Sequence, residues 1–182
     1  MLAVKRTMTV LVFIALTGAI CTLGQSAPPW KVFANRAGWS ISYPADWHIA
    51  SCRSCNDPKA ADVFVDFFPP RKRTADGWVM VSRLANKPAD TSVDAWLVQV
   101  SATANVNKRI HDEPLQVDGL PAIKVRYRQP EGETEEVYVV SGSNTFSVSF
   151  SADPGSAGTS LESLHNYATY VRMLQSFRVK AR

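Results

Sequence analysis

Strand-like segments follow one another directly along this chain, and their order constrains its fold more than any other feature. In a strand, apolar residues either alternate with polar ones or fill both faces. Segments with one of these patterns are 39–43, 62–68, 77–84, 110–117, 123–127, 137–140 and 146–150. One helical pattern interrupts them after residue 84, and another follows the last. Strands in consecutive groups, without regular β-α-β alternation, predict an α+β fold with an antiparallel sheet.

Two of these segments, 62–68 and 77–84, are apolar on both faces. Strands of this kind need cover on both sides of their sheet, which predicts a layered α/β/α arrangement. The first helix is expected to begin near Thr91, in a capping pair with Asp94, and its apolar stripe is Val93, Trp96, Leu97 and Val100. The second is expected over 160–176, with the stripe Leu161, Leu164, Ala168, Val171 and Leu174.

The first 27 residues have the pattern of a secretory signal peptide. Two basic residues open it, residues 10–20 are nearly unbroken apolar sequence, and small or polar residues follow. An apolar run of about 11 residues suits a signal core and is short for a membrane span. Cys21 could carry the lipid of a lipoprotein, but the isoleucine before it is unsuited to that cleavage. We therefore expect 1–27 to be a signal peptide and 28–182 to be one exported domain, periplasmic or secreted, that opens on a short lead-in at 28–31.

The charge of the expected mature domain argues against nucleic acid as a partner. Removal of Lys5 and Arg6 takes the basic residues from 20 to 18, against 16 acidic ones, so the net charge falls from +4 to +2. Proteins that bind nucleic acid carry a concentrated basic footprint instead.

A cysteine pair remains after removal of the signal peptide. Cys52 and Cys55 lie in 50–60, a loop by its composition. An even pair in an oxidising compartment usually closes on itself, so we predict a local disulfide. Thiol–disulfide exchange is the alternative, but reactive thiols usually lie at a helix N-terminus and no helical pattern follows here. Zinc would need two more ligands, and a haem attachment site would need histidine where Asn56 stands.

Residues 67–73 combine aromatic side chains, a Pro-Pro turn and a run of positive charge. The candidate binding residues of this segment are Phe67, Phe68, Arg71, Lys72 and Arg73. A tip of this kind could touch an anionic membrane surface, as a peripheral contact, or an acidic partner. The structural alternative is a phenylalanine pair buried in the sheet, followed by a solvated charged turn.

Three basic side chains share one face of a later strand, and glutamates follow the next turn. The residues are Lys124, Arg126 and Arg128, then Glu131, Glu133, Glu135 and Glu136. Opposite charges that face each other across a hairpin contribute about 0.2–1 kcal/mol per pair, so we predict a ladder of ion pairs. The functional alternative is a polarised sheet face on which the three basic residues dock a charged partner.

No motif in the chain points to catalysis. His48, His111 and His165 are scattered without metal-like spacing, and we expect surface or structural roles for them. The sequence contains no Gly-x-Ser-x-Gly elbow, no His-Glu-x-x-His and no phosphate loop. We therefore predict a protein that is not an enzyme and has no metal site and no cofactor.

Three short motifs resemble the PsbP-like proteins. They are GWSISYPADW at 38–47, similar to the aromatic-x-Tyr-Pro-x-x-Trp start of that superfamily, VDGLPA at 117–122 and QSF at 175–177. The resemblance covers about residues 33–180. It implies an antiparallel sheet of about six or seven strands between helices, and a non-enzymatic role in binding a protein partner or assembling a complex. It carries over no metal ligands, and fold alone is weak ground for function.

The favoured hypothesis is an exported binding or assembly module that acts on a protein partner of the cell envelope. Two alternatives stay open. One is thiol–disulfide exchange at Cys52 and Cys55. The other is a small-ligand or lipid carrier, with a pocket between helix and sheet lined by tryptophan and phenylalanine.

Overall fold

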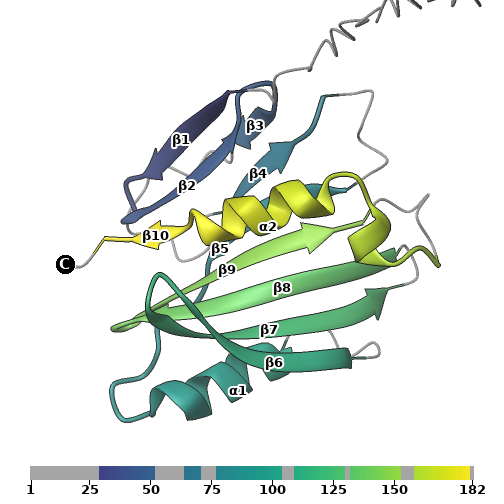
Figure 1. The fold of residues 1–182 in the computed structure, drawn as a ribbon. Coiled ribbons are helices and arrows are strands. Elements are labelled where there is room, and N and C mark those ends of the chain that lie inside the picture. Colours follow the sequence, from purple (N-terminus) through teal and green to yellow (C-terminus); the bar gives the residue numbers. More distant parts are fainter. Residues whose placement is uncertain are drawn as a thin grey trace, which may run out of the picture.

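The computed structural model describes residues 29–51, 64–70, 77–103, 109–129, 132–152 and 158–180 (Figure 1). The expected signal peptide, the cysteine pair and the basic residues at 71–73 lie outside the described residues. The expectations for these segments stay predictions.

The described strands form two antiparallel sheets. The smaller has the order β1-β2-β10, with β1 (Trp30–Asn35), β2 (Trp39–Pro44) and β10 (Arg178–Val179). The larger has the order β3-β4-β5-β9-β8-β7-β6, with β3 (His48–Ser51), β4 (Phe64–Phe68), β5 (Trp78–Arg83), β9 (Asn144–Ser151), β8 (Gly132–Ser141), β7 (Leu120–Gln129) and β6 (Arg109–Val117). All neighbouring strands pair antiparallel. The predicted α+β class is confirmed.

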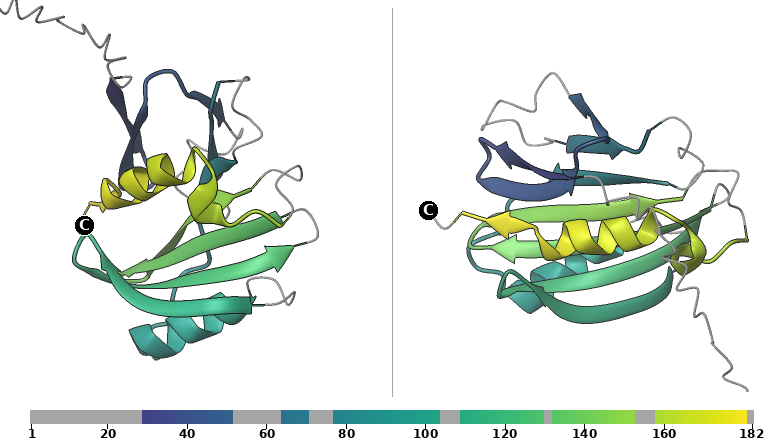
Figure 2. Two further views of the ribbon diagram at one scale, coloured as in Figure 1. Left: turned by 45° about the vertical axis from the view of Figure 1, so that its right-hand side comes forward. Right: turned by 45° about the horizontal axis from the view of Figure 1, so that its top comes forward.

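The helices cover opposite faces of the larger sheet (Figures 1 and 2). Helix α1 (Val93–Thr103) packs on β7 and β8. Helix α2 (Tyr167–Gln175), which follows the 3-10 turn η3 (Leu161–Ser163), contacts β9 and β2 on the other side. Successive side chains of β7 point to opposite faces of the sheet. Val125 packs under α1, whereas Arg126 donates a hydrogen bond to the hydroxyl of Tyr167 in α2. The layered α/β/α arrangement is therefore confirmed.

Each side of the sheet has its own apolar cluster. The main core lies between the two sheets and α2, and its largest fully buried side chains include Trp39, Phe67, Phe146, Phe150, Tyr170 and Phe177. The second cluster lies under α1 and consists of Trp96, Leu97, Val100, Val125, Tyr127, Tyr138 and Val140. Helix α1 therefore rests on a smaller core that is separate from the main one.

The sequence patterns do not predict β1, β3 and β10. Residues 30–31 of the expected lead-in belong to β1, where the Trp30 ring lies 4.2 Å from the Arg172 guanidinium carbon. The local signals are weak, because burial along β1 does not alternate and β10 has two residues. Such strands are defined by their pairing, of β1 and β10 with β2 and of β3 with β4, and not by their own composition.

The C-terminal helix is shorter than predicted. The backbone of Leu164 is extended (φ −74°, ψ 133°) and ends η3, so α2 begins only at Tyr167. The break changes which positions of the helix are buried: Tyr170 and Met173 are fully buried. The predicted stripe positions within α2 are exposed or half-buried, namely Ala168, Val171 and Leu174.

The two-sided cover expected for β4 and β5 is only partly present. The residues that face the main core are Val65, Phe67, Val79 and Val81. On the opposite face Phe68 is half-buried and stacks between His48 and Trp78, with ring centroids 5.4 and 6.2 Å apart. Because α1 packs on β7 and β8, aromatic stacking takes the place of a helix here among the described residues.

Candidate functional site

A cap and one tryptophan place helix α1 on the sheet. The hydroxyl of Ser92 accepts a hydrogen bond from the N–H of Ala95 (3.2 Å), so Ser92 caps the helix and not Thr91 as predicted. The indole N–H of Trp96 donates to Oγ1 of Thr145 on β9 (2.7 Å) in a buried contact. Because indole has a single donor, this bond fixes the orientation of the ring against the sheet.

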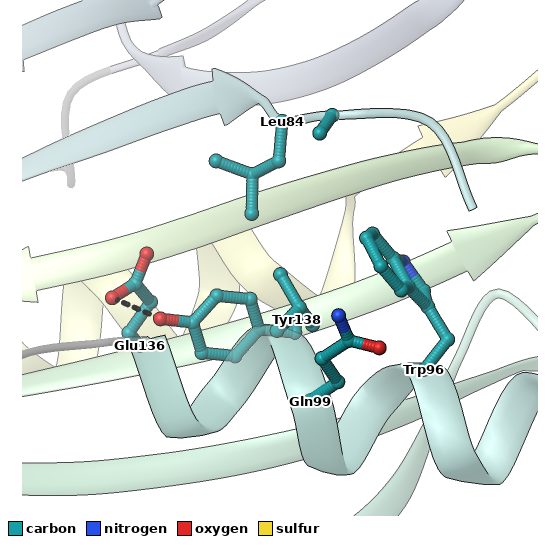
Figure 3. Close-up of a pocket in the computed structure, with 7 residues that line it drawn as sticks. Leu84, Trp96, Gln99, Glu136 and Tyr138 are labelled. Atoms are coloured by element: carbon teal, nitrogen blue, oxygen red, sulfur yellow. Dashed lines mark hydrogen bonds between the residues drawn. The ribbon is translucent and has the colours of Figure 1, made fainter. Parts of the chain in front are cut away.

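A cleft opens between α1 and the sheet beside this tryptophan (Figure 3). Its volume is about 410 Å³, and it is lined by Leu84, Ala85, Trp96, Gln99, Val100, Glu136 and Tyr138. Trp96 and Gln99 come from the helix, Glu136 and Tyr138 from β8, and Leu84 from the segment after β5. Mainly apolar walls with a few polar groups, and a volume of roughly 300–1,000 Å³, are typical of ligand sites.

Glu136 brings a negative charge into this cleft. Its Oε2 accepts hydrogen bonds from the hydroxyls of Tyr138 (2.8 Å) and Tyr127 (3.4 Å). Burial, and after it the adjacent Glu136 charge, raises the pKa of both tyrosines well above 10. Both hydroxyls therefore keep their protons at neutral pH and donate to the carboxylate.

No basic side chain in the described part of the chain forms an ion pair with Glu136. The charge of Arg109 acts on Tyr138. Its guanidinium, however, is bound to Asp112 (2.6 Å) and to the Ser101 hydroxyl (2.9 Å). The cleft thus holds a carboxylate that no described cation neutralises, although charges in apolar surroundings are normally paired.

Two buried serines lie on the same face of the sheet as Glu136 and Tyr138. In the β8–β9 ladder Ser149 is directly opposite Glu136, and Ser147 is directly opposite Tyr138. Neither serine hydroxyl has a hydrogen-bond partner among the described residues. Buried hydroxyls normally have a hydrogen-bond partner, so these two serines are unusual polar groups on the sheet face beside the cleft.

Two solved structures resemble this fold. The solution structure of cyanobacterial PsbP (CyanoP) from Synechocystis sp. PCC 6803 aligns with a TM-score of 0.57 at 14% sequence identity, and the alignment covers 90% of this chain and 98% of that one. The fold is PsbP-like. A crystal structure from Bacteroides thetaiotaomicron VPI-5482 aligns with a TM-score of 0.52 at 15% identity and covers 84% of this chain. This chain spans about half of that structure, 49% of its length.

No protein-family model and no curated protein sequence matches this chain. The structural similarity, at such low identity, shows the PsbP-like fold alone, because one fold serves many functions. The fold that the three sequence motifs predict is therefore confirmed.

Within the PsbP-like fold, Arg126 lies on the α2 side of the sheet, away from the cleft. Its guanidinium pairs with Glu135 (2.7 Å), directly opposite on β8, and with Glu162 of η3 (2.6 Å). The Tyr167 hydroxyl donates to the same oxygen of Glu135 (2.9 Å), and Glu135 is only 2% exposed. This Arg126 clasp joins β7, β8 and the C-terminal segment, so Arg126 serves the fold.

The other two basic residues of this face are also paired. Arg128 pairs with Glu133, directly opposite on β8, and Lys124 pairs with Glu113 on β6. The ladder of opposite charges that the sequence predicts is thus present for Arg126 and Arg128. Glu136 does not join it, because this residue faces α1.

Phe67 and Phe68 have different environments. Phe67 is fully buried in the main core, which corrects its assignment as a binding residue. Phe68 belongs to the half-buried aromatic stack on the opposite face. The remaining residues of the expected tip, Arg71, Lys72 and Arg73, lie outside the described residues.

The histidines are exposed and apart from one another. His48 stacks on Phe68, and His111 lies 3.9 Å from Glu113 on the exposed strand β6. Among the described residues, no group of three or more His, Cys, Asp or Glu side chains is arranged to hold a metal ion. The helices in the described ranges are all too short or too polar to span a membrane.

Glu136, Tyr138 and Gln99 are not among the residues that the sequence indicates as a site. The signal for them is present in the periodicity. Residues 136 and 138 share a face of β8 because side chains alternate along a strand. Residues 96, 99 and 100 share a face of α1 because they are three and four positions apart.

Proposed function

We propose that this chain is an exported, non-catalytic binding or assembly module that acts on a protein partner of the cell envelope through the cleft beneath α1. The observation that carries the proposal is the cleft, in which apolar walls surround a carboxylate without a described cationic partner. The signal-like residues 1–27 support export, and the PsbP-like fold is compatible with a binding role.

The surface around α1 extends beyond this cleft, which favours a protein as the partner. A second groove of about 290 Å³ lies on the other side of the helix, against β6 and β7, and its walls include Leu97, Val98 and Ile123. Val98 is 62% exposed. Protein interfaces combine apolar anchors with a polar rim over many side chains, a pattern that two grooves along one helix can serve.

Site-specific crosslinking in the full-length chain, expressed in its native host, tests this proposal. A photoreactive p-benzoylphenylalanine replaces Gln99 at the rim of the cleft or, as a control, Lys31 on the exposed strand β1. We expect a discrete protein adduct from position 99 only. Ala85→Phe, which fills the cleft without a change of charge, should remove it. Identical adducts from both positions, or adducts insensitive to Ala85→Phe, contradict the proposal.

A small-ligand carrier is the second candidate, because the volume of the cleft is within the range of ligand pockets. The cleft lies between helix and sheet, as that hypothesis requires, although its aromatic residues are Trp96 and Tyr138 and not phenylalanines. Native mass spectrometry of the protein purified from its host tests this function. A bound small molecule that Ala85→Phe removes supports it, and a protein adduct at position 99 without any bound molecule excludes it.

A further inference from the structure

One oxygen of the Glu136 carboxylate accepts no hydrogen bond from the described part of the chain. Both tyrosine hydroxyls donate to Oε2, and no described residue donates to Oε1. Figure 3 shows this second oxygen turned away from the Tyr138 hydroxyl. An ionised carboxylate offers about four lone-pair positions, so the described residues leave about half of its hydrogen-bonding capacity unused.

The charge of Glu136 selects a cation. An anion would be repelled by the carboxylate, and a neutral apolar ligand would remove water from the charge without replacing it, which is costly. A cation gains a charge-assisted hydrogen bond at Oε1. Arg109, whose charge acts on Tyr138, is already held by Asp112 and Ser101.

The walls of the cleft select the stem that carries this charge. Leu84, Val100 and the Trp96 ring are apolar, and the Trp96 N–H is committed to Thr145. An alkyl stem therefore contacts carbon along its length, as the stems of long charged side chains do when their charged end reaches a polar group.

The hydrogen-bond geometry distinguishes lysine from arginine. Arginine binds a carboxylate best as a fork that engages both oxygens, and here the two phenols occupy Oε2. Lysine presents a compact ammonium with three donors on a four-carbon stem and needs one oxygen from each acceptor. The amide oxygen of Gln99, which also lines the cleft, is a further acceptor for this ammonium.

We infer that the cleft beneath α1 binds a lysine side chain of the protein partner, with its stem between Leu84, Trp96 and Val100 and its ammonium on Oε1 of Glu136. This inference rests on the proposed function and names the chemistry that the same site recognises. It makes Glu136 the specificity-determining residue of the cleft, and it makes binding sensitive to salt, since the ion pair is open to solvent at the rim.

An NMR titration of the exported protein with Nα-acetyl-lysine N-methylamide tests the inference, with the norleucine compound, which has the same four-carbon stem without the ammonium, as the uncharged control. We expect weak, saturable shifts of the Trp96 indole N–H with the lysine compound and no saturation with norleucine. Glu136→Gln should weaken binding by about tenfold or more, because the ammonium loses its charged acceptor.

The variants are matched so that loss of fold does not imitate loss of binding. Glutamine at 136 still accepts both phenol hydrogen bonds, so the free energy of unfolding should change little. Glu133→Gln removes the same charge from the other face of the same strand and should leave binding unchanged. Equal affinity for the norleucine compound, or for wild type and Glu136→Gln, overturns the inference.

The same variant separates this inference from the proposed function. If Glu136→Gln abolishes the protein adduct at position 99, both stand. If the adduct survives Glu136→Gln but not Ala85→Phe, the cleft binds a partner by other contacts and the lysine inference fails. If the lysine compound binds through Glu136 while no protein crosslinks at 99, a protein source is wrong and the ligand is a small amine.

Discussion

At the scale of single residues, ion pairs of the Arg126 side chain connect several elements of the fold. Arg126 holds β7 to Glu135 on β8 and to Glu162 in η3, and both distances are below 3 Å. Glu135 is 2% exposed, so its charge is tolerable only while Arg126 stays beside it.

Arg126→Ala should therefore destabilise the fold strongly. Removal of one partner of a buried ion pair costs about 3–5 kcal/mol, because the other charge stays buried and uncompensated. Urea unfolding followed by tryptophan fluorescence measures this loss. Arg128→Ala is the control, since Arg128 is 60% exposed and exposed pairs contribute about 0–1 kcal/mol. Equal losses for the two variants would contradict a buried clasp.

The clasp also gives stability a small dependence on acid. Hydrogen bonding to its own backbone, and then the Arg126 guanidinium, lowers the pKa of Glu162 below its usual 4.5. A group whose pKa is lower in the folded state stabilises the fold above its unfolded pKa, and this contribution is lost as the pH falls through the folded value. Unfolding free energies between about pH 6 and pH 3 should therefore fall less steeply in Glu162→Gln than in wild type. Identical slopes would show that Glu162 contributes nothing.

Two residues on one face of β9, Thr145 and Ser147, should respond in opposite ways to loss of their hydroxyls. Ser147→Ala should be neutral or stabilising by up to about 1 kcal/mol, because its buried hydroxyl has no described partner. Thr145→Val should destabilise by about 1–3 kcal/mol, because it strands the Trp96 indole N–H. Thermal unfolding of the two variants measures the contrast. Destabilisation by Ser147→Ala would indicate that its hydroxyl does have a partner.

At the scale of elements, most of what the sequence predicts is right where periodicity is strong. The alternation of Ile123, Val125 and Tyr127 places β7, and the stripe of Trp96, Leu97 and Val100 places α1. The sequence does not predict strands held mainly by pairing, such as β1, or the extended break at Leu164, which depends on tertiary packing. The cleft is missed for a related reason: Glu136 looks like one of a run of charges until its strand face is known.

The break before α2 can be tested directly, because it determines which side chains of the helix are buried. Met173 is fully buried, so Met173→Ala should cost about 2–5 kcal/mol, typical of a large-to-small change in a core. Val171→Ala, on the predicted stripe but half-buried here, should cost clearly less. Denaturant unfolding of the pair checks the order. The reverse order would favour one continuous helix from residue 160.

At the scale of the whole molecule, the expected export has a chemical consequence. Cys52 and Cys55 lie outside the described residues, and their bridge stays a prediction. Mass spectrometry of the exported protein after alkylation should find neither thiol free. Because the loop is so short, the bridge should stabilise by less than the roughly 3 kcal/mol expected for a 15-residue loop. Free thiols, or insulin reduction that Cys52→Ser abolishes, would favour the exchange function instead.

The small sheet pairs segments that lie far apart in the sequence. Strand β10 pairs with β2, the Ser42 N–H donates to the hydroxyl of Ser176, 134 residues away, and the Lys180 N–H donates to the carbonyl of Gly38. Contacts of such separation form slowly, because a long loop must be ordered before any of them is made. A ribosome would have to release residues 176–180 before the GWSISYP segment could find its partner. The small sheet would thus gain its third strand only at the end of synthesis, whereas the pairing of β5 with β9 needs none of these residues.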